Sequence, residues 1–415
     1  MGDLKQGITA LLMQYAQAAP PEDVRAVMRL SVLDWAACGM AGRAEGTFGP
    51  WAATLRGQGP CTRFDGVSCD PAQAALVNGT LSHALDYDDT HFGHIGHPSV
   101  VVVSAALAVA QARGAALSAL IDAALVGAEA SIAAGLWLGR GHYQIGYHQT
   151  ATAGAFGATI TAARLAQLDP DQTRHALGLV STMASGLKSQ FGTMGKPLNA
   201  GLAARAGVEA ALWAEAGMTS AADGLDGPLG FGETHHGAGA PLELAWRMGS
   251  VAHKFHACCH GLHAALEAVR DVDLAKAASI TVRTHPRWLS VCNKAAPGTG
   301  LEAKFSYAHV LAMAAHGHDT GDIRAFSDAC ARDPELVAFR AQVSVVGDDA
   351  LSEMQAHVDV DGVAFTHDLA AEQPLAVRTD RILQKTRALV GARADDLWQA
   401  IADDDLTGFA QLLTS

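Results

Sequence analysis

The sequence predicts a mainly α protein that combines a large all-helical domain with a smaller α+β domain. From residue 5 to about 217, apolar residues recur with helical spacing almost throughout. Beyond a glycine-rich connection at 223–241, short segments that alternate as strands do lie between helices, and 376–415 returns to a helical pattern. We therefore predict an all-helical domain over 1–254, an α+β domain over 255–375, and C-terminal helices over 376–415 that pack on the helical domain.

Local signals mark the helix boundaries of the first domain. Asp70 and Pro71 supply an N-cap and a proline at the first helical position, so a helix is expected over 71–86. Pro98 opens a second helix, which should stop at Gly114. Further helices are expected at 117–138, 150–167, 170–185 and 198–216. The apolar stretch that begins at 117 contains Asp122 and Glu129, which favours a buried helix over a membrane span.

The second domain carries the strand signals. The segments "ASITVRTH" (278–285) and "RAQVSVVGD" (340–348) alternate apolar and polar residues. The segment "MQAHVDVDGVAFTHDL" (354–369) predicts a hairpin around Asp361-Gly362, because Asp-Gly favours the tight turns that join paired strands. Between these strands, 301–317 has the pattern of a helix.

Composition narrows the function classes. The chain has 415 residues, of which 49% are hydrophobic and 17% charged, and its net charge is −13. So little polar surface suggests a subunit interface, and the acidic balance without a basic cluster argues against nucleic acid. Seven irregularly spaced cysteines predict a reducing compartment. With no signal-peptide pattern at the N-terminus, we predict a cytoplasmic protein with no membrane partner.

The segment "HALDYDDTHFGHIGHPS" (83–99) holds four histidines and three aspartates. It joins two predicted helices, and it could bind a metal, transfer protons or form a solvated junction. A metal interpretation would use His91, His94 and His97 with Asp88 and Asp89, but this spacing needs a helix that the local glycines discourage. From this segment alone, catalysis and a capped junction are equally supported.

Three further segments hold candidate residues. His148 precedes a helix whose N-terminal dipole would lower its pKa, which suits a general base, but from this segment alone a ring that hydrogen-bonds a loop carbonyl is the favoured interpretation. Lys196 lies in a Gly-rich turn before a helix, where two positive features suit a carboxylate; a surface lysine is the plainer alternative. The segment "HKFHACCHGLH" suggests zinc, but adjacent cysteines do not easily ligate one tetrahedral ion.

Taken together, these segments resemble the MmgE/PrpD family. The strings that carry the resemblance are "HALDYDDTH…HPS", "GYHQTATAGAFGA", "FGTMGKPLNAGLAARAGVEA", "K…CC…H" and "EAKFS", in the family's order over nearly the whole chain. The resemblance implies a large helical domain, a smaller α+β lid, a homodimer, and no metal or organic cofactor. It also implies small polycarboxylate substrates, as in 2-methylcitrate dehydratase, cis-aconitate decarboxylase and iminodisuccinate epimerase.

The family's active-site positions fall on a set of six residues in this chain: Asp86, Thr90, His97, His148, Lys196 and Lys254. Three positions depart from the family pattern. Asn199 stands where the family often has His, Cys259 stands where the decarboxylases have His, and His309 stands where a Tyr is usual, with Tyr307 two residues away. One extra residue also separates Thr90 from His97 relative to the decarboxylases.

These residues lead to a hypothesis of proton abstraction next to a carboxylate. His148 or His97 would be the base, Asp86 would orient an imidazole or shuttle a proton, and Lys196 would act in catalysis and clamp a carboxylate. Substrate binding is assigned to Thr90, Lys254, Cys259, Tyr307 and His309, whereas His83, Asp88 and Asp89 are expected to be structural. His91 and His94 lie in the lengthened loop, which is expected to shape the pocket.

The first choice of reaction is a dehydratase-like lyase, with an epimerase as the alternative. A decarboxylase and a catalytically silent binding protein are less favoured, the former because of Cys259.

Overall fold

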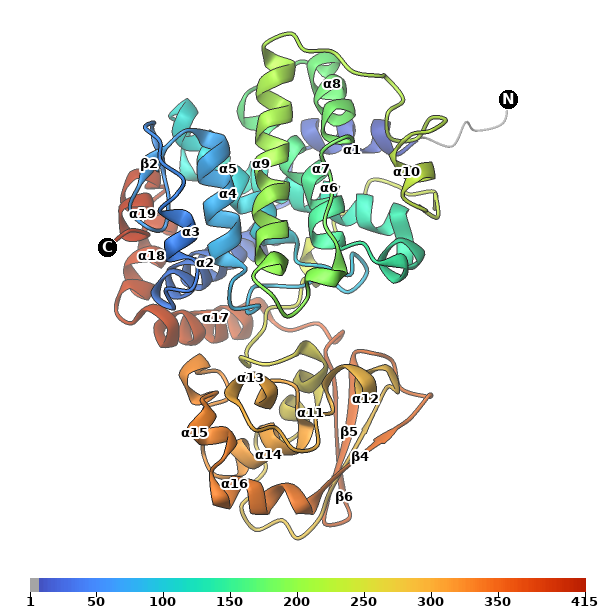
Figure 1. Ribbon diagram of the computed structural model, residues 1–415, viewed down its shortest axis with the longest axis vertical. Coiled ribbons are helices and arrows are strands. Elements are labelled where there is room, and N and C mark those ends of the chain that lie inside the picture. Colours follow the sequence, from blue (N-terminus) through green and yellow to red (C-terminus); the bar gives the residue numbers. More distant parts are fainter. Residues whose placement is uncertain (1–6) are drawn as a thin grey trace. The chain divides into compact units, whose positions relative to one another are not determined.

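The computed structural model describes residues 7–415, which divide into two units (Figure 1). The first unit runs up to His253 and also includes Val390–Ser415, and the second unit is Lys254–Leu389. A mainly helical first unit and a second unit with a mixed sheet agree with the predicted fold class.

The first unit is built almost entirely of helices. They are α1 (Ile8–Gln17), α2 (Glu22–Ala44), α3 (Gly49–Ala52), α4 (Pro71–Ser82), α5 (Pro98–Arg113), α6 (Leu117–Ile145), α7 (Gln149–Leu165), α8 (Pro170–Val180), α9 (Gly195–Glu215), α10 (Phe231–Thr234), α18 (Arg393–Ala402) and α19 (Leu406–Leu412). A small hairpin joins β1 (Cys61–Thr62) to β2 (Ser68–Cys69). The predicted starts at Pro71 and Pro98 are confirmed, and the Asp70 side chain caps α4 by accepting from the Gln73 amide.

Helices α4, α5, α7 and α9 pack against one another and run side by side (Figure 1). Helices α4 and α9 approach closely at two glycines, because a Cβ atom on Gly79 would lie 2.9 Å from the Cα of Gly201. Such close approach fixes the ends of these helices relative to one another, and those ends carry the candidate site.

Helix α6 is long and apolar enough to cross a membrane, but 83% of its most apolar window is buried inside the protein. This burial is typical of a core helix and agrees with the prediction from Asp122 and Glu129. The helix is interrupted at Gly139, where φ is 74° and ψ is 179°.

The second unit contains a four-stranded sheet in the order β4-β3-β5-β6. Its strands are β3 (Ile280–Thr284), β4 (Val343–Gly347), β5 (Gln355–Val360) and β6 (Val363–Asp368), and only β3–β4 is parallel. The predicted hairpin around Asp361-Gly362 is confirmed, since both residues have positive φ as its tight turn requires. The helices are α11 (His263–Ala268), α12 (Arg287–Cys292), α13 (Gly300–Ala303), α14 (Tyr307–Ala315), α15 (Asp328–Ala331), α16 (Pro334–Phe339) and α17 (Leu375–Val390).

Helix α17 differs from the sequence prediction, which packs all of 376–415 on the helical domain. Residues of α17 up to Leu389 belong to the second unit. Arg381 of α17 pairs with Glu267 of α11, and its guanidinium lies 3.8 Å from the centre of the Phe255 ring. A buried ion pair of this kind holds α17 to its own unit, while α18 and α19 join the first unit.

Candidate active site

Four helix ends of the first unit bring the candidate residues together. His83 is the C-cap of α4, His97 is the N-cap of α5, and His148 is the N-cap of α7. Lys196 lies in the first turn of α9. The positive ends of three helix dipoles therefore accompany the lysine, and together they favour an anionic ligand.

Asp88 lies between two imidazoles. Its carboxylate oxygens are 2.9 and 3.1 Å from His83 Nδ1, and one of them is 3.0 Å from His97 Nδ1. Burial alone would raise the pKa of Asp88, but the two neighbouring imidazoles lower it well below its usual value. Asp88 is therefore a buried carboxylate that stays ionised.

Asp86 faces the other side of the His97 ring. Its carboxylate lies 3.3 Å from His97 Nε2 and 2.7 Å from the Lys196 ammonium, and its side chain is 45% exposed. The backbone of Asp86 has a φ of 51°, a left-handed conformation that Asp tolerates better than most residues. This turn aims the Asp86 carboxylate differently from that of Asp88, only two residues away.

His148 is buried beside this group. Its ring stacks near that of His83, with centroids 6.1 Å apart, and meets the Phe191 ring edge to face at 4.9 Å. The Asn199 amide nitrogen lies 3.2 Å from His148 Nδ1 and 3.3 Å from the Leu187 carbonyl oxygen. Burial and the Lys196 charge lower the pKa of His148 well below its usual value, so this imidazole is neutral near pH 7.

A group of four side chains is close enough to be considered for a metal ion: His83, Asp86, Asp88 and His97, whose ligand atoms lie within 4.8 Å of one another. The geometry favours ion pairing and hydrogen bonding instead, because Lys196 already supplies a cation to Asp86, His83 Nδ1 hydrogen-bonds Asp88, and His97 Nδ1 lies 3.0 Å from the same carboxylate. This set also differs from the one that the histidine spacing suggested, since His94 is fully buried and His91 Nδ1 accepts from the His94 amide.

Asp89 belongs to a separate buried cluster. It accepts hydrogen bonds from the Ser31 hydroxyl of α2 at 2.7 Å and from the Ser99 hydroxyl of α5. Burial raises the pKa of Asp89 to about 7, and the negative charges of Asp34 and Asp88 add to this effect. The two hydrogen bonds act in the opposite direction. The contacts of Asp89 are those of an anchor between two helices, as expected for a structural residue.

Thr90 lies at the edge of the junction. Its backbone forms a two-way bridge with Ala252, with N–O distances of 2.9 and 2.7 Å. The bridge ties the junction to the segment just before Lys254, which is itself buried. Backbone pairing thus holds Thr90 against Ala252 within the first unit.

The second unit holds the other predicted residues. The Tyr307 hydroxyl donates to the Gly261 carbonyl at 2.7 Å and lies 3.0 Å from the Thr284 hydroxyl. Gly261 is two residues beyond Cys259, whose side chain is partly exposed. Tyr307 is therefore buried and supports the cysteine segment through its backbone.

His309 has internal partners. Its Nδ1 accepts from the Arg340 guanidinium at 2.8 Å, and its Nε2 lies 3.9 Å from Cys330 Sγ. The ring is fully buried, and both of its nitrogens lie against side chains of the second unit. The predicted binding role of His309 gains no support from this arrangement.

The zinc interpretation of 253–263 also gains no support. His256 lies between the Thr320 hydroxyl and the Glu267 carboxylate, at 2.7 and 3.0 Å. His263 Nε2 lies 3.4 Å from the Cys258 carbonyl oxygen. Among the described residues, the cysteines of this segment do not belong to a group that could hold a metal.

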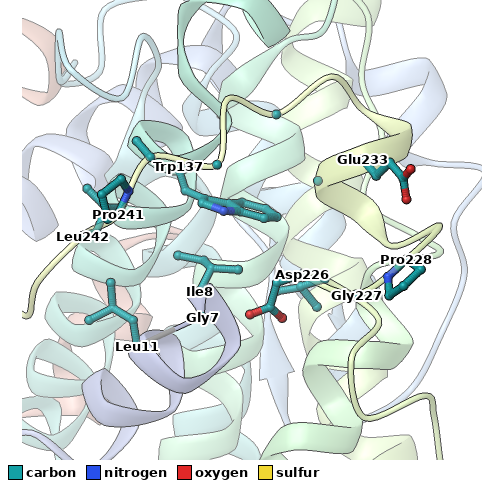
Figure 2. Close-up of a pocket in the computed structure, with 15 residues that line it drawn as sticks. Gly7, Ile8, Leu11, Trp137, Asp226, Gly227, Pro228, Glu233, Pro241 and Leu242 are labelled. Carbon is teal, nitrogen blue, oxygen red and sulfur yellow. The ribbon is translucent and has the colours of Figure 1, made fainter. Parts of the chain in front are cut away.

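A cavity of about 540 Å³ lies elsewhere in the first unit, beside α1 and 225–242 (Figure 2). The Trp137 ring of α6 and the Asp226 side chain both line this cavity (Figure 2). None of the predicted site residues lines it. It is therefore separate from the helix-end cluster.

Sequence reasoning missed three features of the helix-end cluster. Asp88 was expected to be structural, yet it contacts two imidazoles. Asn199 was noted only as a departure, yet it contacts His148, and Phe191 was not singled out although its ring lies beside both His148 and Lys196. For Phe191, the available signal was its position five residues before Lys196 in the same motif.

Models of one protein family match both parts of the chain. The model described as the MmgE/PrpD N-terminal domain matches residues 6–242, and the one described as the MmgE/PrpD C-terminal domain matches residues 256–395. The family resemblance found in the motifs is thereby confirmed.

The chain is also similar to several curated proteins. It is 25% identical to a cis-aconitate decarboxylase of Aspergillus terreus, over 98% of this chain and 94% of that protein. A cis-aconitate decarboxylase-like protein oryM of Aspergillus oryzae is 27% identical over 64% of this chain and 61% of its own length. The cis-aconitate decarboxylase of Homo sapiens is 33% identical over 39% of this chain and 34% of its own length.

Proposed function

The chain belongs to the MmgE/PrpD family, and from this premise we propose that it is an enzyme acting on a small polycarboxylate. The observation that carries the proposal is the cluster of His97, His148, Asp86 and Lys196 at converging helix ends. Lys196 and the helix N-termini suit a substrate carboxylate, and the imidazoles suit proton transfer at the neighbouring carbon.

The first step is removal of a proton from the carbon next to that carboxylate. One imidazole takes the proton, and the electron pair moves into the carboxylate to form an enediolate, which the Lys196 ammonium stabilises. In a dehydration, the enediolate then expels a hydroxyl group from the adjacent carbon, and the hydroxyl leaves as water after protonation. We propose a dehydratase of the 2-methylcitrate type that uses no metal or organic cofactor.

A decarboxylase is the second candidate, and the names of the relatives favour it. In that reaction a carbon–carbon bond breaks, CO₂ leaves, and the remaining electron pair is protonated by an imidazole. Cys259, where the decarboxylases carry His, favours the dehydratase. An epimerase shares the first step and returns the proton to the opposite face of the same carbon.

One experiment separates these reactions. The purified protein is incubated in D₂O with citrate, 2-methylcitrate, cis-aconitate, iminodisuccinate or tartrate, and the products are followed by NMR. We expect deuterium in the remaining substrate at the carbon next to a carboxylate, where the enediolate is re-protonated, together with loss of water to an unsaturated product. Release of CO₂ from cis-aconitate would identify the decarboxylase, and exchange with inversion the epimerase. The proposal is wrong if no compound exchanges and His148→Ala and Lys196→Ala bind each compound as the wild type does.

We also propose a cytoplasmic homodimer. Exposed apolar side chains at the start of α9 and along it, such as Met194, Leu202 and Trp213, are 40–45% accessible and would suit a subunit interface. All seven cysteines are free, which suits a reducing compartment. Light scattering at several concentrations tests the dimer: a monomer mass throughout would contradict it.

A further inference from the structure

The two site histidines have opposite kinds of neighbour at the same ring atom. At His97, Nδ1 faces the Asp88 carboxylate at 3.0 Å. At His148, Nδ1 faces the Asn199 amide nitrogen at 3.2 Å. A neutral imidazole carries its proton on one nitrogen and a lone pair on the other, so the partner at Nδ1 decides what Nε2 presents to a substrate.

Asp88 can only accept a hydrogen bond, because it remains ionised between two imidazoles. Asp86 also accepts on the Nε2 side, but it lies farther from the ring, at 3.3 Å, and pairs with Lys196 at 2.7 Å. The closer Asp88 carboxylate, at 3.0 Å, therefore favours a proton on His97 Nδ1, in the neutral form as well as in the imidazolium. Its Nε2 is the atom that gains and loses a proton, on the side where Asp86 and Lys196 lie. A carboxylate behind an imidazole also stabilises the cation that forms when Nε2 takes a proton.

Asn199 imposes the reverse arrangement on His148. Its amide nitrogen lies 3.3 Å from the Leu187 carbonyl oxygen, which can only accept, so one N–H of the amide points there. The second N–H faces His148 Nδ1, which must then be unprotonated and accept with its lone pair. Because the pKa of His148 is held well below its usual value by burial and by Lys196, the ring stays neutral with its proton on Nε2.

We propose that Asp88 and Asn199 are positioning residues that set opposite tautomers on His97 and His148. His97 Nε2 then takes the proton from the substrate carbon, and His148 Nε2–H donates a hydrogen bond to the enediolate oxygen. This division of roles rests on the proposed function, which leaves open which imidazole is the base. Asn199 is also where this chain departs from a common family residue, so the second tautomer is a property of this chain's own sequence.

The charged and titratable groups around the two rings come from several elements. Those near His97 are Asp86 and Asp88 of the junction, His83 at the C-cap of α4, His94 of the loop and His148 at the N-cap of α7, while Lys196 of α9 pairs with Asp86. His148 is influenced by Lys196, His83, His97 and Asp86. Removing the Asp88 charge should lower the pKa of His97, because a neighbouring carboxylate favours the imidazolium.

The direct test is NMR of the full-length protein with ¹⁵N-labelled histidine, assigned with His97→Gln and His148→Gln. We expect a protonated Nδ1 on His97 and a protonated Nε2 with an unprotonated Nδ1 on His148. The opposite tautomer on either ring overturns the proposal. This measurement needs no substrate, so it tests the two tautomers independently of the proposed function. If every polycarboxylate proves inert, only the proposed function is contradicted.

Asp88→Asn tests the first half kinetically. The neutral amide removes the negative charge 3.0 Å from His97 Nδ1 and no longer favours a proton there, so we expect kcat to fall about 10²–10⁴-fold. KM should stay within about threefold, and the acidic limb of the pH profile should move to lower pH. Asp89→Asn is the matched control, since this adjacent carboxylate contacts serines, and its pH profile should match the wild type. Equal profiles for the two variants overturn the role of Asp88.

Asn199→Asp tests the second half. A carboxylate at this position accepts from Nδ1–H and raises the pKa of His148. In the neutral ring the proton then lies on Nδ1, and Nε2 can no longer donate. We expect activity at low pH and a new alkaline limb that falls about tenfold per pH unit. Asn78→Asp is the control, because Asn78 is a buried amide of α4 whose partners are the Phe64 amide and the Thr62 carbonyl. A new limb in both variants, or in neither, overturns the role of Asn199.

Discussion

Asp88 and Asp89 are adjacent in the chain and equally buried, yet they belong to two different environments. The imidazole side of the junction comprises His83, Asp86, Asp88 and His97, whereas the hydroxyl side comprises Asp89, Ser99 of α5, and Ser31 and Asp34 of α2. On the imidazole side the pKa of Asp88 is lowered well below its usual value, and on the hydroxyl side the pKa of Asp89 is raised to about 7. Burial is common to both, so the neighbours decide the charge.

The difference separates two tasks. The imidazole side keeps a permanent charge that orients His97, and it continues through Asp86 to Lys196. The hydroxyl side ties the junction to α2 and α5 through Asp89. We infer that changes on the imidazole side reduce catalysis, while changes on the hydroxyl side alter the free energy of unfolding.

Lys196→Met should have the largest effect on the imidazole side. The variant keeps the length of the side chain but leaves Asp86 without its cation at 2.7 Å and removes the charge proposed to hold a substrate carboxylate. We expect kcat/KM to fall about 10³-fold, equivalent to about 4 kcal/mol of transition-state stabilisation. Lys188→Met is the matched control, because Lys188 lies eight residues earlier and its ammonium donates to the Tyr143 carbonyl. A similar loss in both variants would contradict the role of Lys196.

Asp89→Asn should change how stability depends on pH. A carboxyl group whose pKa is about 7 in the folded state, against about 3.9 when unfolded, opposes folding increasingly as the pH rises from about 4 to about 7. Over that range the wild type should lose about 4 kcal/mol relative to the variant, which cannot ionise there. Urea denaturation of both proteins at pH 4.5, 6 and 8 measures this difference.

Asp88→Asn provides the comparison of opposite sign. Because the pKa of Asp88 is lowered on folding, its stabilising contribution is present above the unfolded pKa and is lost as the pH falls below it. Below about pH 4 the wild type should lose stability relative to Asp88→Asn, whereas Asp89→Asn should gain stability relative to the wild type as the pH rises above about 4. Parallel curves for both variants would mean that the two sides of the junction do not differ as described.

The parts of the fold that sequence predicts are those with local causes. The N-cap Asp70, the prolines at 71 and 98, and the Asp361-Gly362 turn act within a few residues, and the structure confirms each of them. Helix α4 stops at Ser82, four residues before the predicted end. Residues 83–85 form a turn after the helix, and Asp86 then adopts a left-handed backbone that a continuing helix could not accommodate.

The candidate site was predictable as a set of residues and not as a set of contacts. Motif order leads to Asp86, His97, His148 and Lys196, and the structure brings these four into one cluster. The division between Asp88 and Asp89 depends on Ser31, which lies 58 positions before Asp89, and so cannot be read from "DYDD". His309 shows the same limit, because Arg340 lies 31 positions away and engages its ring.

Metal removal should have the smallest effect, and it tests whether the imidazole side is a metal centre. Its four side chains could gather around an ion, unlike those of the hydroxyl side, but Lys196 already neutralises Asp86. A divalent ion would also have to displace the proton that His83 Nδ1 donates to Asp88. We therefore expect less than a stoichiometric amount of metal by mass spectrometry and activity within twofold after dialysis against a chelator. Added zinc should inhibit, since it would compete with Lys196 for Asp86; stoichiometric metal whose removal abolishes activity would instead make the imidazole side a metal centre.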